Sequence, residues 1–327
     1  MNLNDVSEIV WKQCFEAKKN EKALVVFDQR TKEIADSLFK TGRKFCTVSK
    51  IETAKSRMHG SEPEKQVADA MFDSDIIVAP TFYSLTHTKA VHRSRKTGKA
   101  RVITLPGIIK DMYLRAVPID YKEMKQYAEN ICSKWKKKSL TIETESGTDL
   151  YIVTKGRKIE LDSGLSTTPG MLNNLPAGEV ELSPLEKKSE GKVIIDLTHP
   201  LKGKVKRPFE IKIENGEMVD CEDKELWKIC SETKNGTNLA EFAVGTNPKA
   251  KIIGIMLEDE KRIKTSHIAL GTSISLGGKV QSSMHLDCVF NKPTILADSE
   301  IIMKDGNPIQ RIPRNRHFRF HSETEKN

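Results

Sequence analysis

His285 and Asp287 stand two residues apart in the largely apolar stretch SSMHLDCVF, residues 282–290. The apolar neighbours predict a buried strand, and residues i and i+2 of a strand point to the same side. We therefore expect both side chains on one face and Cys288 on the opposite face. A buried carboxylate is costly unless it is paired or binds a metal. The pair is a candidate for metal ligation, with a hydrogen-bonded core pair as the alternative.

Three further polar residues interrupt segments of buried character. Glu179 lies in NNLPAGEVELSP, Glu241 in NLAEFAVGTNP and His267 in SHIALGTS. Each of them alone is more often a hydrogen-bonded core residue or a turn residue than a ligand. Together, three carboxylates and two imidazoles suit a hard or borderline divalent metal, and a carboxylate would bridge the ions of a two-metal centre. The residues therefore predict a metal cluster without specifying a reaction: Glu179, Glu241, His267, His285 and Asp287.

The first part of the chain alternates strand and helix patterns. Short apolar runs predict strands over 22–27, 44–48, 74–80 and 100–106, and helical spacing predicts helices over 30–41, 63–72, 86–98 and 120–138. This rhythm is typical of an open parallel sheet with helices on its faces. Neither a GxGxxG nor a GxxxxGK[ST] motif follows the first strand, so the usual phosphate-binding loops are absent from the sequence.

Thr81 and His87 follow the strand that ends at Pro80. The carboxyl ends of parallel strands are where ligands bind in open α/β sheets, so both residues are candidates for facing a cleft between domains. The alternative is that residues of this segment cap the helix that begins near Thr86.

After residue 138 the pattern changes to strict alternation with turn signals. Strands are expected over 139–164, 191–198, 209–219, 251–257, 266–270 and 282–290, with one helix near 222–233 and a hairpin turn at Asn215-Gly216. The sequence predicts an α/β protein: an N-terminal open parallel α/β sheet domain, residues 1–138, followed by a β-rich α+β domain, residues 139–327, that carries the metal site.

Composition and charge narrow the class of protein. The net charge is +9, and 37% of the 327 residues are hydrophobic, which permits a packed core. The sequence has neither a run of about 18 apolar residues nor the apolar core of a signal peptide, so we expect a cytoplasmic protein with no membrane partner. The basic tail 311–321 could contact nucleic acid, but only 6% of residues are aromatic and no binding motif is present. We prefer a solvated basic surface.

Six cysteines without a CxxC motif indicate reduced structural thiols.

The segments LPAGEV, NLAEFAVGTNP, HIALG and HLD resemble, in that order, the aminopeptidase T family of metallopeptidases, over roughly 170–305. The resemblance implies two divalent metal ions, zinc or cobalt, a peptide substrate and a homodimer. Carried across, the metal ligands are Glu179, Glu241, His267, His285 and Asp287. It also implies a hydrolase that removes N-terminal residues through a metal-activated water, with Glu179 as the general base.

A second branch on the same scaffold is similar to 2,5-dihydroxypyridine 5,6-dioxygenase. The peptidases carry a tyrosine seven residues after the first ligand histidine, where this chain has Ile274, and no tyrosine follows Tyr151. The dioxygenase resemblance implies one Fe(II) held by His267, His285 and Asp287, with Glu179 as a base beside a small-molecule substrate. Because all five peptidase ligands are present, we expect the hydrolase and keep the dioxygenase as the alternative.

Overall fold

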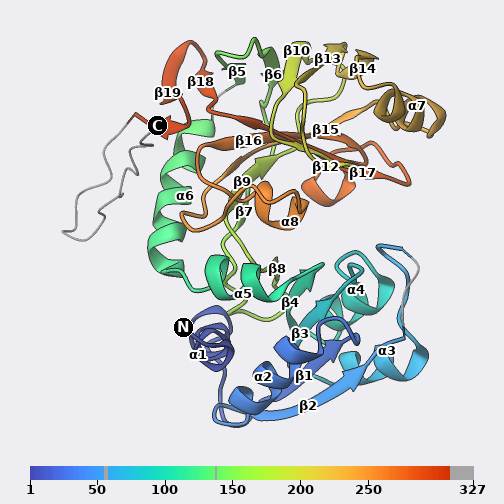
Figure 1. Cartoon of the computed structure of the whole chain (residues 1–327), viewed down its shortest axis with the longest axis vertical. Coiled ribbons are helices and arrows are strands. Elements are labelled where there is room, and N and C mark those ends of the chain that lie inside the picture. Colours follow the sequence, from blue (N-terminus) through green and yellow to red (C-terminus); the bar gives the residue numbers. More distant parts are fainter. Residues whose placement is uncertain (55–57, 137, 310–327) are drawn as a thin grey trace.

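The structure is a computed structural model, and it describes residues 1–54, 58–136 and 138–309. The chain forms one parallel sheet with helices on both faces and, above it, two antiparallel sheets that pack face to face (Figure 1). The predicted fold class, a parallel α/β part followed by a β-rich part, is confirmed.

Sheet A has the strand order β2-β1-β3-β4-β8 and is parallel throughout. Val25 and Val78 lie on one face of the sheet and pack against helices at the start of the chain. Leu24 and Ile77 lie on the other face and pack against the two helices between residues 65 and 96. The strands are β1 Lys22–Phe27, β2 Thr47–Glu52, β3 Ile76–Thr81, β4 Arg101–Pro106 and β8 Leu172–Asn174. The helices are α1 Leu3–Ile9 with a π-helical turn Val10–Cys14, α2 Lys32–Gly42, α3 Lys65–Phe72, α4 Lys89–Lys96 and α5 Lys110–Ala116.

Strand β8 comes from beyond residue 138 and completes sheet A. The proposed boundary at residue 138 stays a prediction, but the chain crosses back to the first sheet after that point. Helix α6, Tyr121–Trp135, also connects the two parts: Tyr121 packs in the core beside sheet A and Trp135 in the core of the β-rich part.

One predicted strand begins later than expected, and another is wrong. The segment 44–48 was expected to be extended, but the N–H groups of Phe45 and Cys46 still donate to the carbonyl of Gly42, so the strand begins only at Thr47. The segment 251–257 was also expected to be a strand. It is a loop that leads into α8, Met256–Asp259, because the Asp259 carboxylate accepts the N–H groups of Ile253 and Gly254 and folds the segment back.

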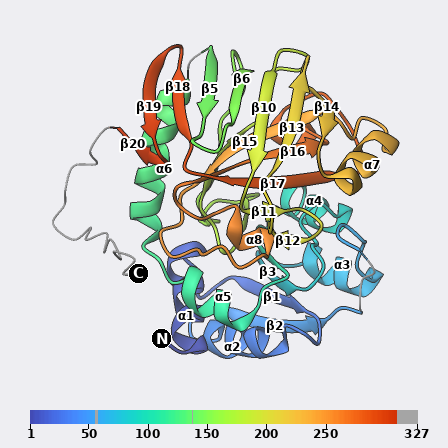
Figure 2. The same cartoon turned by 45° about the horizontal axis from the view of Figure 1, so that its top comes forward.

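Sheets B and C form the β-rich part (Figure 2). Sheet B contains, in spatial order, β14 Glu217–Cys221, β13 Phe209–Glu214, β10 Glu190–Ile195, β6 Asp149–Val153, β5 Ser139–Glu143, β18 Thr294–Ala297, β19 Glu300–Lys304 and β20 Asn307–Pro308. Sheet C contains β12 Gly203–Lys204, β11 Thr198–His199, β17 His285–Asn291, β16 Thr265–Gly271, β15 Leu239–Gly245, β9 Glu179–Leu182 and β7 Glu160–Asp162. Helix α7, Lys224–Glu232, follows β14, and a short 3-10 helix spans Ile274–Leu276.

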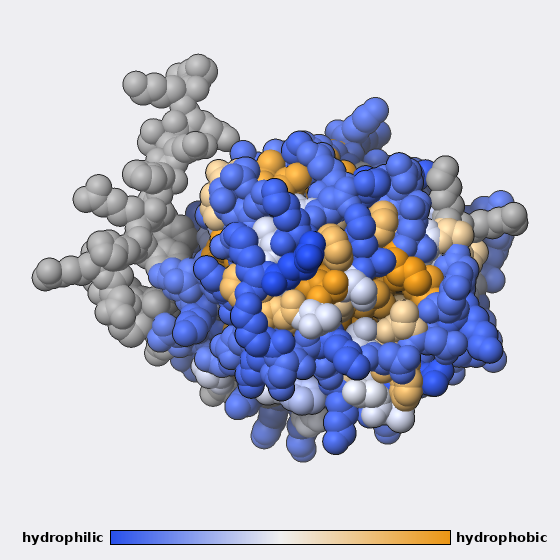
Figure 3. Space-filling view, turned by 90° about the horizontal axis from the view of Figure 1, so that it is seen from below, coloured by the Kyte–Doolittle hydropathy of each residue, from blue (hydrophilic) through white to orange (hydrophobic). Residues whose placement is uncertain are grey.

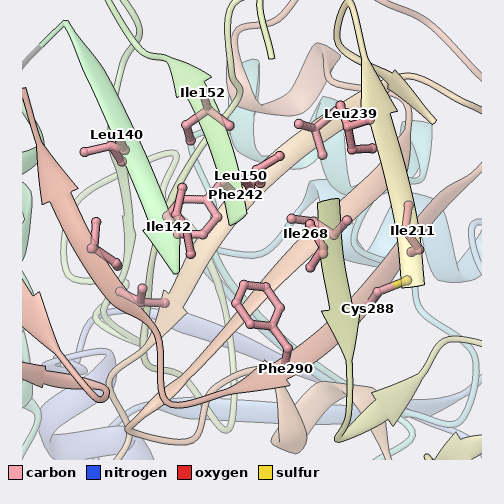
Figure 4. Close-up of a cluster of buried hydrophobic side chains, with 14 of the residues drawn as sticks. Leu140, Ile142, Leu150, Ile152, Ile211, Leu239, Phe242, Ile268, Cys288 and Phe290 are labelled. Atoms are coloured by element: carbon pink, nitrogen blue, oxygen red, sulfur yellow. The ribbon is translucent and has the colours of Figure 1, made fainter. Parts of the chain in front are cut away.

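The two sheets enclose a hydrophobic core. Phe242, Ile268 and Phe290 of sheet C pack with side chains of sheet B such as Ile142 and Ile211 (Figure 4). All five are buried. Alternate residues of a strand point to opposite sides of a sheet. The residues that alternate with these core side chains in sheet C therefore lie on its other face.

The outer surface is charged. The face seen from below is mainly hydrophilic, with hydrophobic residues gathered in a band across its middle (Figure 3). Among the described residues, no helix is both long enough and apolar enough to cross a membrane.

Candidate functional site

The five predicted ligands lie on one face of sheet C, opposite to the core. The antiparallel register places Glu179 opposite Gly245, Glu241 opposite Ala269, and His285 opposite Gly271. The small residues at these facing positions leave the long polar side chains room to converge. Cys288 points into the core, as predicted from its alternation with Asp287.

Glu241 lies at the centre of the cluster. Its Oε1 lies 3.1 Å from Nε2 of His267, and its Oε2 lies 2.9 Å from Nε2 of His285. Nε2 of His285 also lies 3.3 Å from Oδ1 of Asp287, while its Nδ1 lies 2.9 Å from the carbonyl oxygen of Thr272. One carboxylate therefore holds two imidazoles, and a backbone carbonyl fixes the orientation of one of them.

Glu179 joins the same cluster from β9. Its Oε2 lies 3.7 Å from Nε2 of His267 and has no hydrogen-bond partner among the described residues, although it is buried. The preceding Gly178 has φ +126°, a conformation that favours glycine, and a Cβ there would lie 2.8 Å from the backbone nitrogen of Asn247. A turn that requires glycine therefore precedes Glu179, whereas the role of Glu179 as a base stays a prediction.

Within the described part of the chain, three overlapping groups of side chains could each hold a metal ion. In each group, one ligand atom from every member lies within 4.8 Å of the others. The groups are Glu179, Glu241 and His267; Glu241, His285 and Asp287; and Glu260, His267 and Asp287. The structure brings all five predicted ligands together, and their mixture of carboxylates and imidazoles suits a divalent metal.

The charged groups of the cluster shift one another's pKa values. Burial alone would raise the pKa of Glu241, but the hydrogen bonds with His267 and His285 hold it well below its usual value. Burial opposes the charged form of His267, yet the hydrogen bond and negative charge of Glu241 raise its pKa to about 9. The pKa of His285 also lies well above the usual value, because the charge of Asp287 and hydrogen bonds outweigh its burial. The carboxylates of the cluster therefore stabilise positive charge on both imidazoles.

Two functional candidates were missed by the sequence reasoning: Glu260 and Lys261. The Nζ of Lys261, whose side chain is 2% exposed, contacts Glu179 and lies 2.7 Å from Oε1 of Glu260 and 3.8 Å from Oδ2 of Asp162. The run EDEKR, residues 258–262, looks like a solvated charge cluster. Its position directly after the apolar segment 252–257 was the one signal that it could turn inward.

Burial also changes the acids around Lys261. It raises the pKa of Glu260 to about 8 and that of Asp162 to about 7, while the ammonium of Lys261 acts in the opposite direction. Burial disfavours the charged lysine, but the surrounding carboxylates, Glu179 first, hold its pKa well above the usual value. Lys261 is therefore a buried positive charge surrounded by carboxylates.

The N-terminal part approaches the cluster at His87. Its pKa is lowered by burial and, secondly, by the positive charge of His285, which places the two imidazoles within electrostatic reach. Thr81 lies elsewhere, on a cavity of about 570 Å³ that Arg30 and Phe82 also line. Thr88 caps α4 by accepting the N–H of Val91, so the cap of this helix is neither candidate residue. A substrate role for His87 stays a prediction.

Other predicted features lie away from the centre. Ile274, at the position of the peptidase tyrosine, lies in the 3-10 helix and is 51% exposed. The basic tail considered for nucleic-acid binding, residues 311–321, lies outside the described residues.

Comparison with known proteins identifies relatives of the whole chain. The structure of 2,5-dihydroxypyridine dioxygenase from Pseudomonas putida KT2440 matches with a TM-score of 0.80 and 16% identity over 94% of this chain and 97% of that one. AmpT from Thermus thermophilus, an aminopeptidase T, matches with a TM-score of 0.70 and 16% identity over 94% of this chain and 99% of that one. At such identity the two structures show a common fold. Both resemblances stated from the sequence are thereby confirmed.

No curated protein sequence matches the chain significantly. One family profile does match, over residues 40–310, and its description is 2,5-dihydroxypyridine 5,6-dioxygenase. Because this match spans most of the chain, including four of the five strands of sheet A and the cluster on sheet C, the protein belongs to the NicX family, named for 2,5-dihydroxypyridine 5,6-dioxygenase.

Proposed function

We propose that this protein is a metal-dependent dioxygenase that opens a hydroxylated aromatic ring. The observation that carries the proposal is the open side of the cluster. The side chains of His285 and Asp287 are 28% and 20% exposed, while His267 beside them is 1% exposed. Two imidazoles and one carboxylate leave metal positions open for a substrate and dioxygen, and these positions would face the accessible side. Membership of the NicX family supports the same reaction class.

The chain's own residues have distinct tasks in this proposal. His267, His285 and Asp287 would hold Fe(II), which supplies the dioxygen-binding and electron-transfer chemistry by which both oxygen atoms enter the opened ring. Glu241 contacts the same Nε2 atoms that would face the ion, so its carboxylate would lie beside the ion, whereas the carbonyl oxygen of Thr272 orients His285 through Nδ1, the nitrogen left free by the metal. Glu179 takes the proton of a ring hydroxyl, because its Oε2 points toward the cluster and lacks a hydrogen-bond partner in the described structure.

Peptide hydrolysis is the second candidate, and the convergence of Glu179 and Glu241 with the three other ligands supports it. A hydrolase would need two zinc or cobalt ions to polarise the peptide carbonyl and activate a water. This candidate lacks the tyrosine that the peptidases carry, because Ile274 stands at that position. The homodimer implied by the resemblance also stays a prediction for either reaction.

Metal analysis combined with two activity assays tests the proposal. Protein purified without added metal is loaded anaerobically with Fe(II), and oxygen uptake is followed with dihydroxypyridines and related hydroxylated rings. We expect about one iron per chain and substrate-dependent uptake. The variant H285A should lose the bound iron and the oxygen uptake. The control H92A, which removes an exposed histidine of α4, should retain the iron and the uptake. Release of N-terminal residues from peptides by zinc- or cobalt-loaded protein, without oxygen uptake, would instead establish the hydrolase.

A further inference from the structure

A buried lysine is unusual because removing an ammonium group from water is costly unless carboxylates surround it. Lys261 lies two residues after the end of α8, and its side chain reaches carboxylates of sheet C. Its Nζ contacts Glu179 from β9 and Asp162 from β7, at the distances given above, together with its own neighbour Glu260. The ammonium therefore gathers three carboxylates from separate segments, as a bound cation does.

Two of these carboxylates are shared with the candidate metal cluster. Glu179 belongs to one group of possible ligands with Glu241 and His267, and Glu260 belongs to another with His267 and Asp287. The cluster thus has two ends. One end is formed by Glu241, His285 and Asp287, and the other, where Glu179 and Glu260 each share a group with His267, carries the positive charge of Lys261.

We propose that the ammonium of Lys261 occupies the place of a second cation, so that this chain binds one divalent metal per site. A second divalent ion held by Glu179 or by Glu260 would lie beside the ammonium that already contacts these carboxylates, and like charges so close repel strongly where little water separates them. A single metal at the other end keeps its imidazole and carboxylate ligands without this conflict. Lys261 is then a positioning residue that determines the number of metals. The inference rests on the proposed metal site but not on the reaction that the site catalyses.

The test counts metals by titrating metal-free protein with Co²⁺, using calorimetry, elemental analysis of the dialysed product and the cobalt spectrum. We expect one Co²⁺ per wild-type chain. The variant K261M removes the charge at similar length and frees the acidic end, so it should take up a second Co²⁺, with magnetic coupling between the two ions. The variant K261R keeps the charge and should bind one.

The possible outcomes separate this inference from the proposed function. Two ions in the wild-type chain would overturn the role of Lys261 while leaving the metal enzyme intact, and no bound ion would overturn both. One ion in both the wild-type chain and folded K261M would show that the lysine does not determine the number. If K261M does not fold, the double variant K261M/E260Q removes one negative charge together with the ammonium, retains Glu179, and is expected to bind the second ion more weakly than the first.

Discussion

At the scale of single residues, the cluster depends on one carboxylate that serves two imidazoles. Glu241 is 4% exposed and pairs with His267 on the neighbouring strand and His285 one strand further. A buried acid in this position is stable because both oxygens have partners. Both histidines are thereby oriented with their Nε2 atoms toward the same point.

Replacing Glu241 with glutamine tests this arrangement. The amide has one acceptor oxygen and one donor nitrogen, so it cannot accept from both imidazoles as the carboxylate does. We expect the affinity for Co²⁺ or Fe²⁺ to fall by about 10–100-fold, because a neutral amide replaces a carboxylate charge directly beside the ion. Competition with a chromogenic chelator measures it. The matched control E214Q alters an exposed acid of β13 and should bind as the wild type does; equal affinity in E241Q would remove Glu241 from the metal environment.

The sequence predicted the cluster because each of its five members interrupts an apolar pattern. His285 and Asp287 share a strand, so alternation alone places them together. Glu260 and Lys261 could not be found in this way, because a run of charges has the same appearance whether it is solvated or folded inward. The contacts of its ammonium with Asp162 and Glu179 come from about 80 to 100 residues away in the chain, where no local pattern could show them.

At the scale of elements, most strands and helices follow from their periodicity, and the exceptions have local causes. Strand β1 has the predicted bounds, and α7 at Lys224–Glu232 lies within the predicted range. The strand predicted over 44–48 begins only at Thr47, because the turn after α2 continues through Cys46. The strand predicted over 251–257 is a loop, because the carboxylate of Asp259, which lies beyond this segment, accepts two of its backbone N–H groups. Apolar composition alone does not distinguish a strand from a loop held by a carboxylate.

Helix α7 offers a test of how one element is held. Asp223 caps it by accepting the N–H of Leu226 at 3.0 Å, and it also pairs with Nζ of Lys202 at 2.6 Å. The variant D223A loses the cap and the ion pair, whereas D223N retains a capping oxygen. We expect D223A to lower the free energy of unfolding by about 1 kcal/mol or slightly more, and D223N to lower it less. Urea denaturation measures both, with D220N, at an exposed acid of β14, as the control.

The stability that Asp223 contributes should also depend on pH. Partial burial acts to raise its pKa, but the hydrogen bonds from Lys202 and from the N–H of Leu226 lower it to about 2. Because the folded-state pKa is below the usual value of about 4, the stabilisation is present above pH about 4 and is lost as the pH falls through about 2. The stability difference between the wild type and D223N should therefore shrink between pH 5 and pH 2. A constant difference would mean that the charge of Asp223 contributes nothing.

At the scale of the whole molecule, the parallel part and the β-rich part are joined by buried polar contacts as well as by α6. Nδ2 of Asn247, which is fully buried, donates to the carbonyl oxygens of Ala116 and Ala177. Arg115 of α5 pairs through two nitrogens with Glu258 of α8. These partners are up to 143 residues apart, so local patterns in the sequence could not predict them.

The Arg115–Glu258 pair yields the sharpest test of this connection. Glu258 is 0% exposed and also accepts the N–H of Lys251, whereas the Arg115 side chain is 18% exposed. The variant R115M leaves a buried carboxylate without its cation and should lower the free energy of unfolding by roughly 3–5 kcal/mol. The double variant R115M/E258M removes both charges and should recover a large part of that loss.

Urea denaturation at neutral pH measures the cycle, with K110M as the matched control. Lys110 lies on the same helix, and its pair with Glu33 is more than half exposed on both sides, so its loss should change stability by at most about 1 kcal/mol. Since Glu258 lies three residues before Lys261, R115M should also displace the segment that carries the lysine and permit uptake of a second Co²⁺, as K261M is expected to do, and R115M/E258M should restore binding of one ion. If R115M matched K110M in stability, the Arg115–Glu258 pair would contribute little to joining the two parts of the molecule, and the position of Lys261 would not depend on it.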